Sequence, residues 1–155
     1  MFVLLRQLQR LRRDAALTAP PRRGSLALRH VDAGSCNACE HELTAAANPY
    51  YDLARHGLNV VASPRHADVL LVTGPVTARM REPLLKAYEA MPEPRTVAAL
   101  GDCAMGCGVL GDAAALAPPL DELLPVAIRI PGCPPAPDVI AAHLLAHLHG
   151  EPPAA

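Results

Sequence analysis

The chain has 155 residues, of which 51% are apolar, and its formal net charge at pH 7 is −1. This length suffices for one domain with a buried core, and a near-neutral chain with 3% aromatic residues gives no support to nucleic-acid binding. No apolar run approaches the roughly 20 residues that a helix needs to cross a bilayer, and the apolar run at residues 2–5 is too short for a secretory signal. We therefore expect a cytoplasmic protein, either free or bound to a partner.

The beginning of the chain is basic, whereas the rest is acidic. Residues 1–29 contain seven arginines and a single acid, and the remainder contains seven basic and fourteen acidic residues. Within residues 1–13, leucines recur on one helical face, which predicts a short basic amphipathic helix. We expect residues 1–24 to form an arm and linker that docks to lipid headgroups or to an acidic partner. A loosely ordered, arginine-rich tail is the alternative.

From residue 25 onward, short apolar segments alternate with helical patterns. The apolar run at residues 67–75 is typical of a strand that is buried on both faces of a parallel sheet. The other expected elements are strands at 26–31, 58–62, 96–100 and 126–130 (the last two also buried), helices at 39–47, 77–90 and 138–149, a turn at 50–57, and an irregular stretch with some helix at 113–124. This alternation predicts an α/β domain over residues 25–150 with a flavodoxin-like, doubly wound and mainly parallel sheet, followed by a disordered tail at residues 151–155.

All five cysteines lie in three short, glycine-containing stretches, at residues 34–40, 101–108 and 130–135. Cys103 and Cys133 each follow directly after a predicted strand, and the first stretch also follows a strand. Because ligands of doubly wound sheets bind outside the carboxyl ends of the strands, the topology predicts that the three stretches meet at one edge of the sheet. In a reducing compartment, such cysteines favour metal binding or redox chemistry over disulfide bonds.

The spacing of the cysteines favours an iron–sulfur cluster over a structural zinc ion. Zinc sites typically use two close pairs of ligands, whereas here one close pair, Cys36 and Cys39, is joined by cysteines 64 and 94 residues beyond Cys39. Neighbouring glycines let the backbone approach and offer N–H groups to cluster sulfides. A zinc site, a thiol redox pair formed by Cys36 and Cys39, and inert buried thiols are the alternatives.

The same three stretches, together with residues 51–57 and 63–74, resemble the 20 kDa iron–sulfur subunit family. This family includes the cluster-N2 subunit of respiratory complex I, the NADH–quinone oxidoreductase, and the small subunits of NiFe hydrogenases. The resemblance extends over residues 25–150, which is most of the chain. It implies one 4Fe–4S cluster ligated by four cysteines: Cys36, Cys39, Cys103 and Cys133.

Within this family, complex I subunits have adjacent cysteines at the first position, whereas hydrogenase small subunits have two residues between them. Cys36 and Cys39 therefore make the chain similar to the membrane-bound, complex I-related hydrogenases of the formate hydrogenlyase and hydrogenase-4 type. The resemblance implies an electron-transfer subunit of a membrane-associated oxidoreductase, without a complete active site or a catalytic residue of its own. The corresponding subunit of NADH–quinone oxidoreductase, whose terminal cluster reduces quinone, is the alternative within the family. A zinc-stabilised structural or interaction module is the alternative outside it.

The resemblance also implies partners and a location. The partners would be a large subunit of NiFe type or similar to the 49 kDa subunit of complex I, a ferredoxin-like iron–sulfur subunit, and membrane-arm subunits, with no nucleic acid. The chain would lie peripherally on the cytoplasmic face of the inner (cell) membrane.

Cys107 departs from the family pattern, in which this position is usually glycine. It is either an alternative ligand or redox-active neighbour, or a small buried thiol in the place of a glycine, and we expect the latter. Glu40, in the first turn of an expected helix, is interpreted as complementing the helix dipole. His143 and His147 have a spacing that could bind a metal, but with no third ligand nearby in the sequence we expect them on a solvated helix face.

Overall fold

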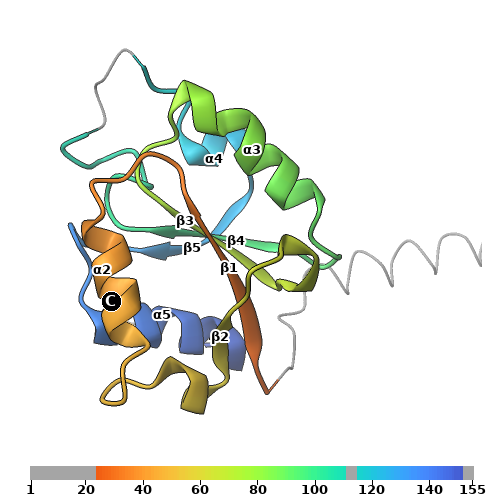
Figure 1. Cartoon of the computed structure of the whole chain (residues 1–155), viewed down its shortest axis with the longest axis vertical. Helices are drawn as coiled ribbons and strands as arrows, with labels where there is room; N and C mark the ends of the chain where they lie inside the picture. The colour runs from red at the N-terminus through yellow and green to blue at the C-terminus, as the bar shows by residue number, and fades with distance from the viewer. Residues whose placement is uncertain (1–23, 111–114, 152–155) are drawn as a thin grey trace, which may run out of the picture.

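A five-stranded sheet forms the centre of the structure (Figure 1), a computed structural model that describes residues 24–110 and 115–151. All neighbouring strands are parallel, and their order is β2-β1-β3-β4-β5. This is the flavodoxin-like order, and it confirms the predicted doubly wound, parallel sheet. The strands are β1 (Leu26–Asp32), β2 (Leu58–Val60), β3 (Val69–Thr73), β4 (Thr96–Leu100) and β5 (Val126–Ile130).

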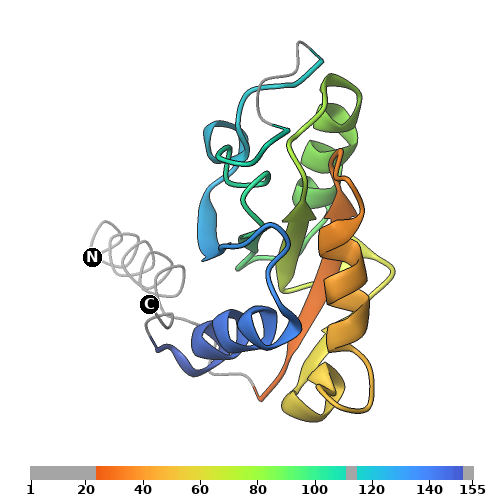
Figure 2. The same cartoon turned by 90° about the vertical axis from the view of Figure 1, so that its left-hand side faces the viewer.

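Helices cover both faces of the sheet, as Figures 1 and 2 show from two directions. Helices α2 and α5 pack on one face, and α3 and α4 lie on the other. The α-helices are α2 (Ala38–Ala46), α3 (Ala78–Glu89), α4 (Leu120–Leu123) and α5 (Pro137–His149), and two 3-10 helices span Leu53–His56 and Pro64–His66. These bounds agree closely with the helices expected from the sequence.

The sheet separates two apolar cores. In one core, Leu71 of β3 packs in a cluster with Leu144 of α5, and in the other, Leu70 of β3 packs in a cluster with Leu84 of α3. Successive side chains of a strand point to opposite faces, so β3 contributes to both cores. All five residues of β3 are buried, as predicted for a central strand of a parallel sheet.

The prediction of a buried strand at residues 126–130 is wrong in one respect. β5 is an edge strand in which Ile128 and Ile130 are buried, whereas Ala127 and Arg129 are exposed. The isoleucines face the core formed with α5. The guanidinium of Arg129 forms an ion pair with the carboxylate of Asp121 on α4, at 3.8 Å.

Parts of two predicted regions lie outside the described residues. These are the amphipathic helix and most of the arm predicted over residues 1–24, and residues 152–155 of the expected tail. Within the ranges that the structure describes, no helix is long and apolar enough to cross a bilayer.

Candidate metal centre at the carboxyl edge of the sheet

The carboxyl ends of four strands lie in register at one edge of the sheet. Asp32 of β1 pairs with Thr73 of β3, Thr73 pairs with Leu100 of β4, and Leu100 pairs with Ile130 of β5. Three of these strands, β1, β4 and β5, lead directly into the three cysteine-containing stretches. The parallel register therefore brings segments that are distant in the sequence to the same edge, from which α2 and α5 also start (Figure 1).

Hydrogen bonds join the loop after β4 to the loop after β5. The amide of Asp102 donates to the carbonyl oxygen of Gly132 (2.9 Å), and the amide of Gly132 donates to Oδ1 of Asp102 (2.7 Å). These two residues directly precede Cys103 and Cys133, so the pair of bonds sets the positions of both cysteines. Asp102 was not among the functional residues predicted from the sequence. Its place between Gly101 and Cys103 was the available signal.

A second group of hydrogen bonds fixes the loop that carries Cys36 and Cys39. The carboxylate of Glu40 accepts hydrogen bonds from Oγ of Ser35 (2.7 Å) and from Oγ1 of Thr73. Ser35 directly precedes Cys36, and Glu40 directly follows Cys39, so the bonds bracket the cysteine pair and attach it to β3. Glu40 thus has a specific structural role besides its place in the first turn of α2, and neither Ser35 nor Thr73 was identified from the sequence.

Polar contacts continue from this group into the sheet. Nε2 of His30 on β1 lies 2.9 Å from Oγ1 of Thr73 and 3.6 Å from Oε1 of Glu40. Burial lowers the pKa of His30, and this outweighs the opposing effect of the nearby carboxylates of Glu40 and Asp32. A neutral His30 is therefore the form that this environment favours at neutral pH.

Four of the five thiols share one electrostatic environment. Cys39 and Cys103 are buried, whereas Cys36 and Cys133 are exposed. The pKa of Cys39 is raised to about 12, first by burial and then by the negative charges of Glu40, Cys36, Cys103 and Cys133. Thiolates that raise one another's pKa in this way are stabilised by a cationic centre. The chemistry of this donor set therefore suits a metal–sulfur cluster, although the four thiols, all within the described residues, are not arranged around a single metal ion.

Desolvation and nearby negative charges also act on the thiol of Cys133. The pKa of its thiol is raised by partial desolvation and then by the negative charges of Cys103, Asp102 and Cys36. Cys103 also interacts with Cys133 as a hydrogen-bonding side chain. The loops after β1, β4 and β5 thus influence one another's sulfur atoms.

Two glycines bring the backbone into contact with sulfur. A Cβ atom added to Gly101 would lie 2.7 Å from Sγ of Cys39, and a Cβ atom added to Gly108 would lie 2.3 Å from Sγ of Cys103. Real side chains do not tolerate such distances, so both positions require glycine. The backbone at these positions forms part of the wall around the thiols, as expected from the glycines beside the cysteines.

Cys107 differs from the other four cysteines. Its thiol is exposed and donates a hydrogen bond to the carbonyl oxygen of Asp102 (3.4 Å). Cys107 does not contribute to the raised pKa values of Cys39 and Cys133. The expectation that Cys107 is a buried thiol is therefore wrong, because its segment of the loop lies at the protein surface.

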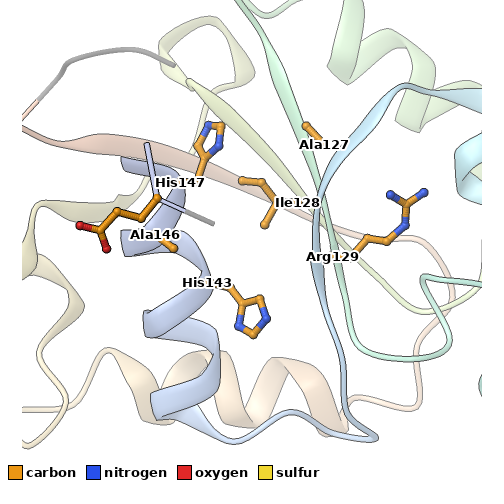
Figure 3. A pocket seen from close by; sticks show the side chains of 7 residues that line it. Ala127, Ile128, Arg129, His143, Ala146 and His147 are labelled. Atoms are coloured by element: carbon orange, nitrogen blue, oxygen red, sulfur yellow. The ribbon is translucent and has the colours of Figure 1, made fainter. Parts of the chain in front are cut away.

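The histidine pair of α5 lies apart from the cysteines, beside a cavity of about 170 Å³ next to Arg129 of β5 (Figure 3). His143 is buried, with Nδ1 2.9 Å from the carbonyl oxygen of Val139, so the prediction of a solvated face is wrong for this residue. Nε2 of His147 is buried without a hydrogen-bond partner among the described residues, and burial lowers the pKa of His147. Neither histidine belongs to a group of three or more His, Cys, Asp or Glu residues that could hold a metal ion within the described ranges.

Comparison with known protein families gives one match that spans most of the domain. The family model described as NADH ubiquinone oxidoreductase, 20 Kd subunit, matches residues 36–147. This range begins at the first cysteine and includes all five.

Two relatives and one solved structure show how far the similarity extends. The probable membrane-bound hydrogenase subunit mbhJ of Pyrococcus furiosus is 48% identical over 111 residues, which cover 72% of this chain and 66% of that protein. Formate hydrogenlyase subunit 7 of Escherichia coli is 45% identical over 107 residues, which cover 69% of this chain and 42% of that protein. A chain of the membrane-bound sulfane sulfur reductase, an archaeal respiratory membrane complex, superposes with a TM-score of 0.69 at 31% identity, covering 86% of this chain and 76% of that one.

Proposed function

Because the chain belongs to the 20 kDa subunit family of NADH–ubiquinone oxidoreductase, we propose that it is an electron-transfer subunit that binds one 4Fe–4S cluster. It would act within a multisubunit, membrane-associated oxidoreductase and leave substrate chemistry to other subunits. The observation that carries this proposal is the meeting of three cysteine loops at the carboxyl edge of the sheet, where desolvation and then the charges of Cys36 and Cys103 raise the pKa values of both Cys39 and Cys133.

The proposed ligands of the cluster are four cysteines: Cys36, Cys39, Cys103 and Cys133. Thiolates are the usual ligands of such clusters, and a bound cluster accepts and releases one electron at a time. The hydrogen bonds of Glu40 and Asp102 would hold the loops that carry these ligands in place around the cluster. Close backbone approach at Gly101 would offer polar groups to the sulfur atoms, which is a recognised influence on reduction potential.

The type of assembly is proposed from the first cysteine pair. The two residues between Cys36 and Cys39 support a complex I-related NiFe hydrogenase of the formate hydrogenlyase type, and relatives that bear hydrogenase names support the same choice. The description of the family favours the second candidate, the corresponding subunit of an NADH–quinone oxidoreductase with a quinone-reducing terminal cluster.

The exposed surface beside the cysteines supports a large partner subunit of NiFe type or similar to the 49 kDa subunit of complex I. Cys36 and Cys133 are exposed in this chain, and Val109, in the loop after β4, is 89% exposed. Apolar and thiol groups at one edge favour burial by another protein. A ferredoxin-like subunit and membrane-arm subunits would complete the electron path. The basic residues 1–24 would help to attach the assembly to the cytoplasmic face of the membrane.

Chemical analysis of the anaerobically purified assembly tests this function. Iron, acid-labile sulfide, zinc and nickel should be measured, together with EPR spectra after reduction with dithionite. Iron and sulfide in similar amounts, with the spectrum of a reduced cluster, would support the proposal. Zinc without sulfide would overturn it and would favour a zinc-stabilised structural or interaction module. Nickel would identify the hydrogenase type, and its absence would favour the quinone-linked type.

A further inference from the structure

Asp102 forms hydrogen bonds with the loop after β5 and with a later part of its own loop. Its amide and its carboxylate form the reciprocal bonds with Gly132, at 2.9 and 2.7 Å. Its carbonyl oxygen accepts bonds from the amide (3.0 Å) and the thiol (3.4 Å) of Cys107. Asp102 therefore connects the end of β4 with the loop after β5 and with the far end of its own loop.

The carboxylate of Asp102 also adds a negative charge close to the thiols. Its Oδ1 lies 2.7 Å from the amide nitrogen of Gly132, the residue directly before Cys133, and Asp102 itself directly precedes Cys103, so the charge lies beside two of the proposed ligands. Among the described residues, no cationic side chain forms an ion pair with Asp102. A nearby negative charge favours the oxidised form of a cluster over the reduced form, which carries one electron more.

We infer that Asp102 is a positioning residue that holds Cys103 and Cys133 in place for the cluster and, through its charge, lowers the reduction potential of that cluster. This inference rests on the proposed function. The first effect comes from the hydrogen bond between the carboxylate and Gly132, and the second comes from the charge of the same carboxylate. Two substitutions separate them, because an amide keeps the acceptor and loses the charge.

The test compares Asp102→Asn and Asp102→Ala in the complete, anaerobically purified assembly. Glu82→Gln is the control for loss of a negative charge, because Glu82 is an exposed residue of α3 that pairs with Lys86. Iron and acid-labile sulfide give the cluster content, and an EPR-monitored redox titration gives the midpoint potential. The signal of this cluster is identified by its disappearance in a Cys103→Ser assembly.

Asp102→Asn is expected to retain the cluster content of the wild type and to shift the midpoint potential in the positive direction. Asp102→Ala is expected to lose a substantial part of the iron and sulfide, whereas Glu82→Gln should match the wild type in both measurements. Loss of the cluster in Asp102→Asn to the same extent as in Asp102→Ala, or an unchanged potential in Asp102→Asn, would overturn the inference. So would full cluster content in Asp102→Ala. A wild-type assembly without this cluster would instead overturn the proposed function itself.

Discussion

The backbone at Gly108 leaves no space for a side chain beside Cys103. The added Cβ atom would also lie within 2.7 Å of backbone atoms of Cys103, and Gly108 is not among the glycines with positive φ. Steric overlap, rather than backbone strain, is therefore the obstacle to substitution, and overpacking of this kind costs about 1–3 kcal/mol.

We expect Gly108→Ala to displace Cys103 and to lower the iron and sulfide content of the purified assembly. Gly24→Ala is the matched control, because a Cβ atom at Gly24 would meet nothing within 4 Å among the described residues. Wild-type cluster content in the Gly108→Ala assembly would show that the loop can move aside and that this contact is unimportant.

His147 links the stability of the fold to pH. Burial lowers its pKa below the ordinary value of 6.5, so the unfolded chain binds a proton more readily than the folded chain. Burial of His147 therefore destabilises the folded chain increasingly as the pH falls below 6.5, whereas this pH-dependent penalty is absent well above that value. Nε2 of His147 also lacks a hydrogen-bond partner among the described residues, which typically costs about 1–3 kcal/mol.

Replacement of His147 by leucine should therefore raise the thermal unfolding midpoint, and the gain should be larger near pH 5.5 than near pH 7.5. The exposed His149 on the same helix provides the control substitution, His149→Leu. Equal pH dependence in His147→Leu and the wild type would contradict this assignment.

Single residues differ in how well the sequence predicts their roles. The cysteines could be selected as ligand candidates because they follow predicted strands and lie beside glycines. The roles of Asp102 and Thr73 depend on which groups lie opposite them in other segments, and no local pattern indicates such neighbours. The burial of His143 could not be predicted for the same reason, because α5 is apolar on more than one side.

At the scale of elements, Thr73 connects β3 with α2 and β1. It is fully buried, donates to Glu40, and lies within hydrogen-bond distance of His30. Thr73→Val keeps the shape of the side chain but removes the hydroxyl group. We expect a loss of about 1–3 kcal/mol in the free energy of unfolding, because buried polar groups lose a partner.

Chemical denaturation would measure this loss, with Thr96→Val at the start of β4 as the control on a neighbouring strand. Because the same hydroxyl attaches the loop of Cys36 and Cys39 to the sheet, Thr73→Val should also reduce cluster content. Equal unfolding free energies for the two valine variants would contradict the role assigned to Thr73.

The strands and helices themselves were largely predictable, since β3 has a continuous apolar run and the helices end near proline or glycine. β5 was the exception. The alternation of exposed Ala127 and Arg129 with buried Ile128 and Ile130 was visible in the sequence, and it indicates a strand with one open face. The charged Arg129 was the local signal that this strand lies at the edge of the sheet.

At the scale of the whole molecule, the edge that carries the cysteines is also the proposed contact surface for the large subunit. Val109→Asp should weaken co-purification of that subunit, because it places a charge in an apolar contact. Val60→Asp is the control, since Val60 is 55% exposed on β2 and outside the cysteine loops. Equal recovery of the large subunit with both variants would place the contact elsewhere.

Strand order is a property of the whole molecule. The sequence predicted the class of sheet, but it did not assign a position in the sheet to each strand. The alternation of strands and helices predicted a parallel, doubly wound sheet, but the position of each strand depends on how the crossover helices pack. The observed order places β3 between β1 and β4, with β5 beyond β4, and the parallel register brings the carboxyl ends of these strands to one edge. This arrangement turns one cysteine pair and two distant cysteines into a single candidate site.

The most direct test of this site compares iron and acid-labile sulfide in assemblies with Cys103→Ser and Cys107→Ser. The two cysteines lie in the same loop, but only Cys103 is buried and contributes to the raised pKa values of Cys39 and Cys133. We expect Cys103→Ser to lose about four iron and about four sulfide per assembly relative to the wild type, and Cys107→Ser to lose none. Loss of iron and sulfide from the Cys107→Ser assembly, or their full retention in the Cys103→Ser assembly, would contradict the assignment of the cluster ligands.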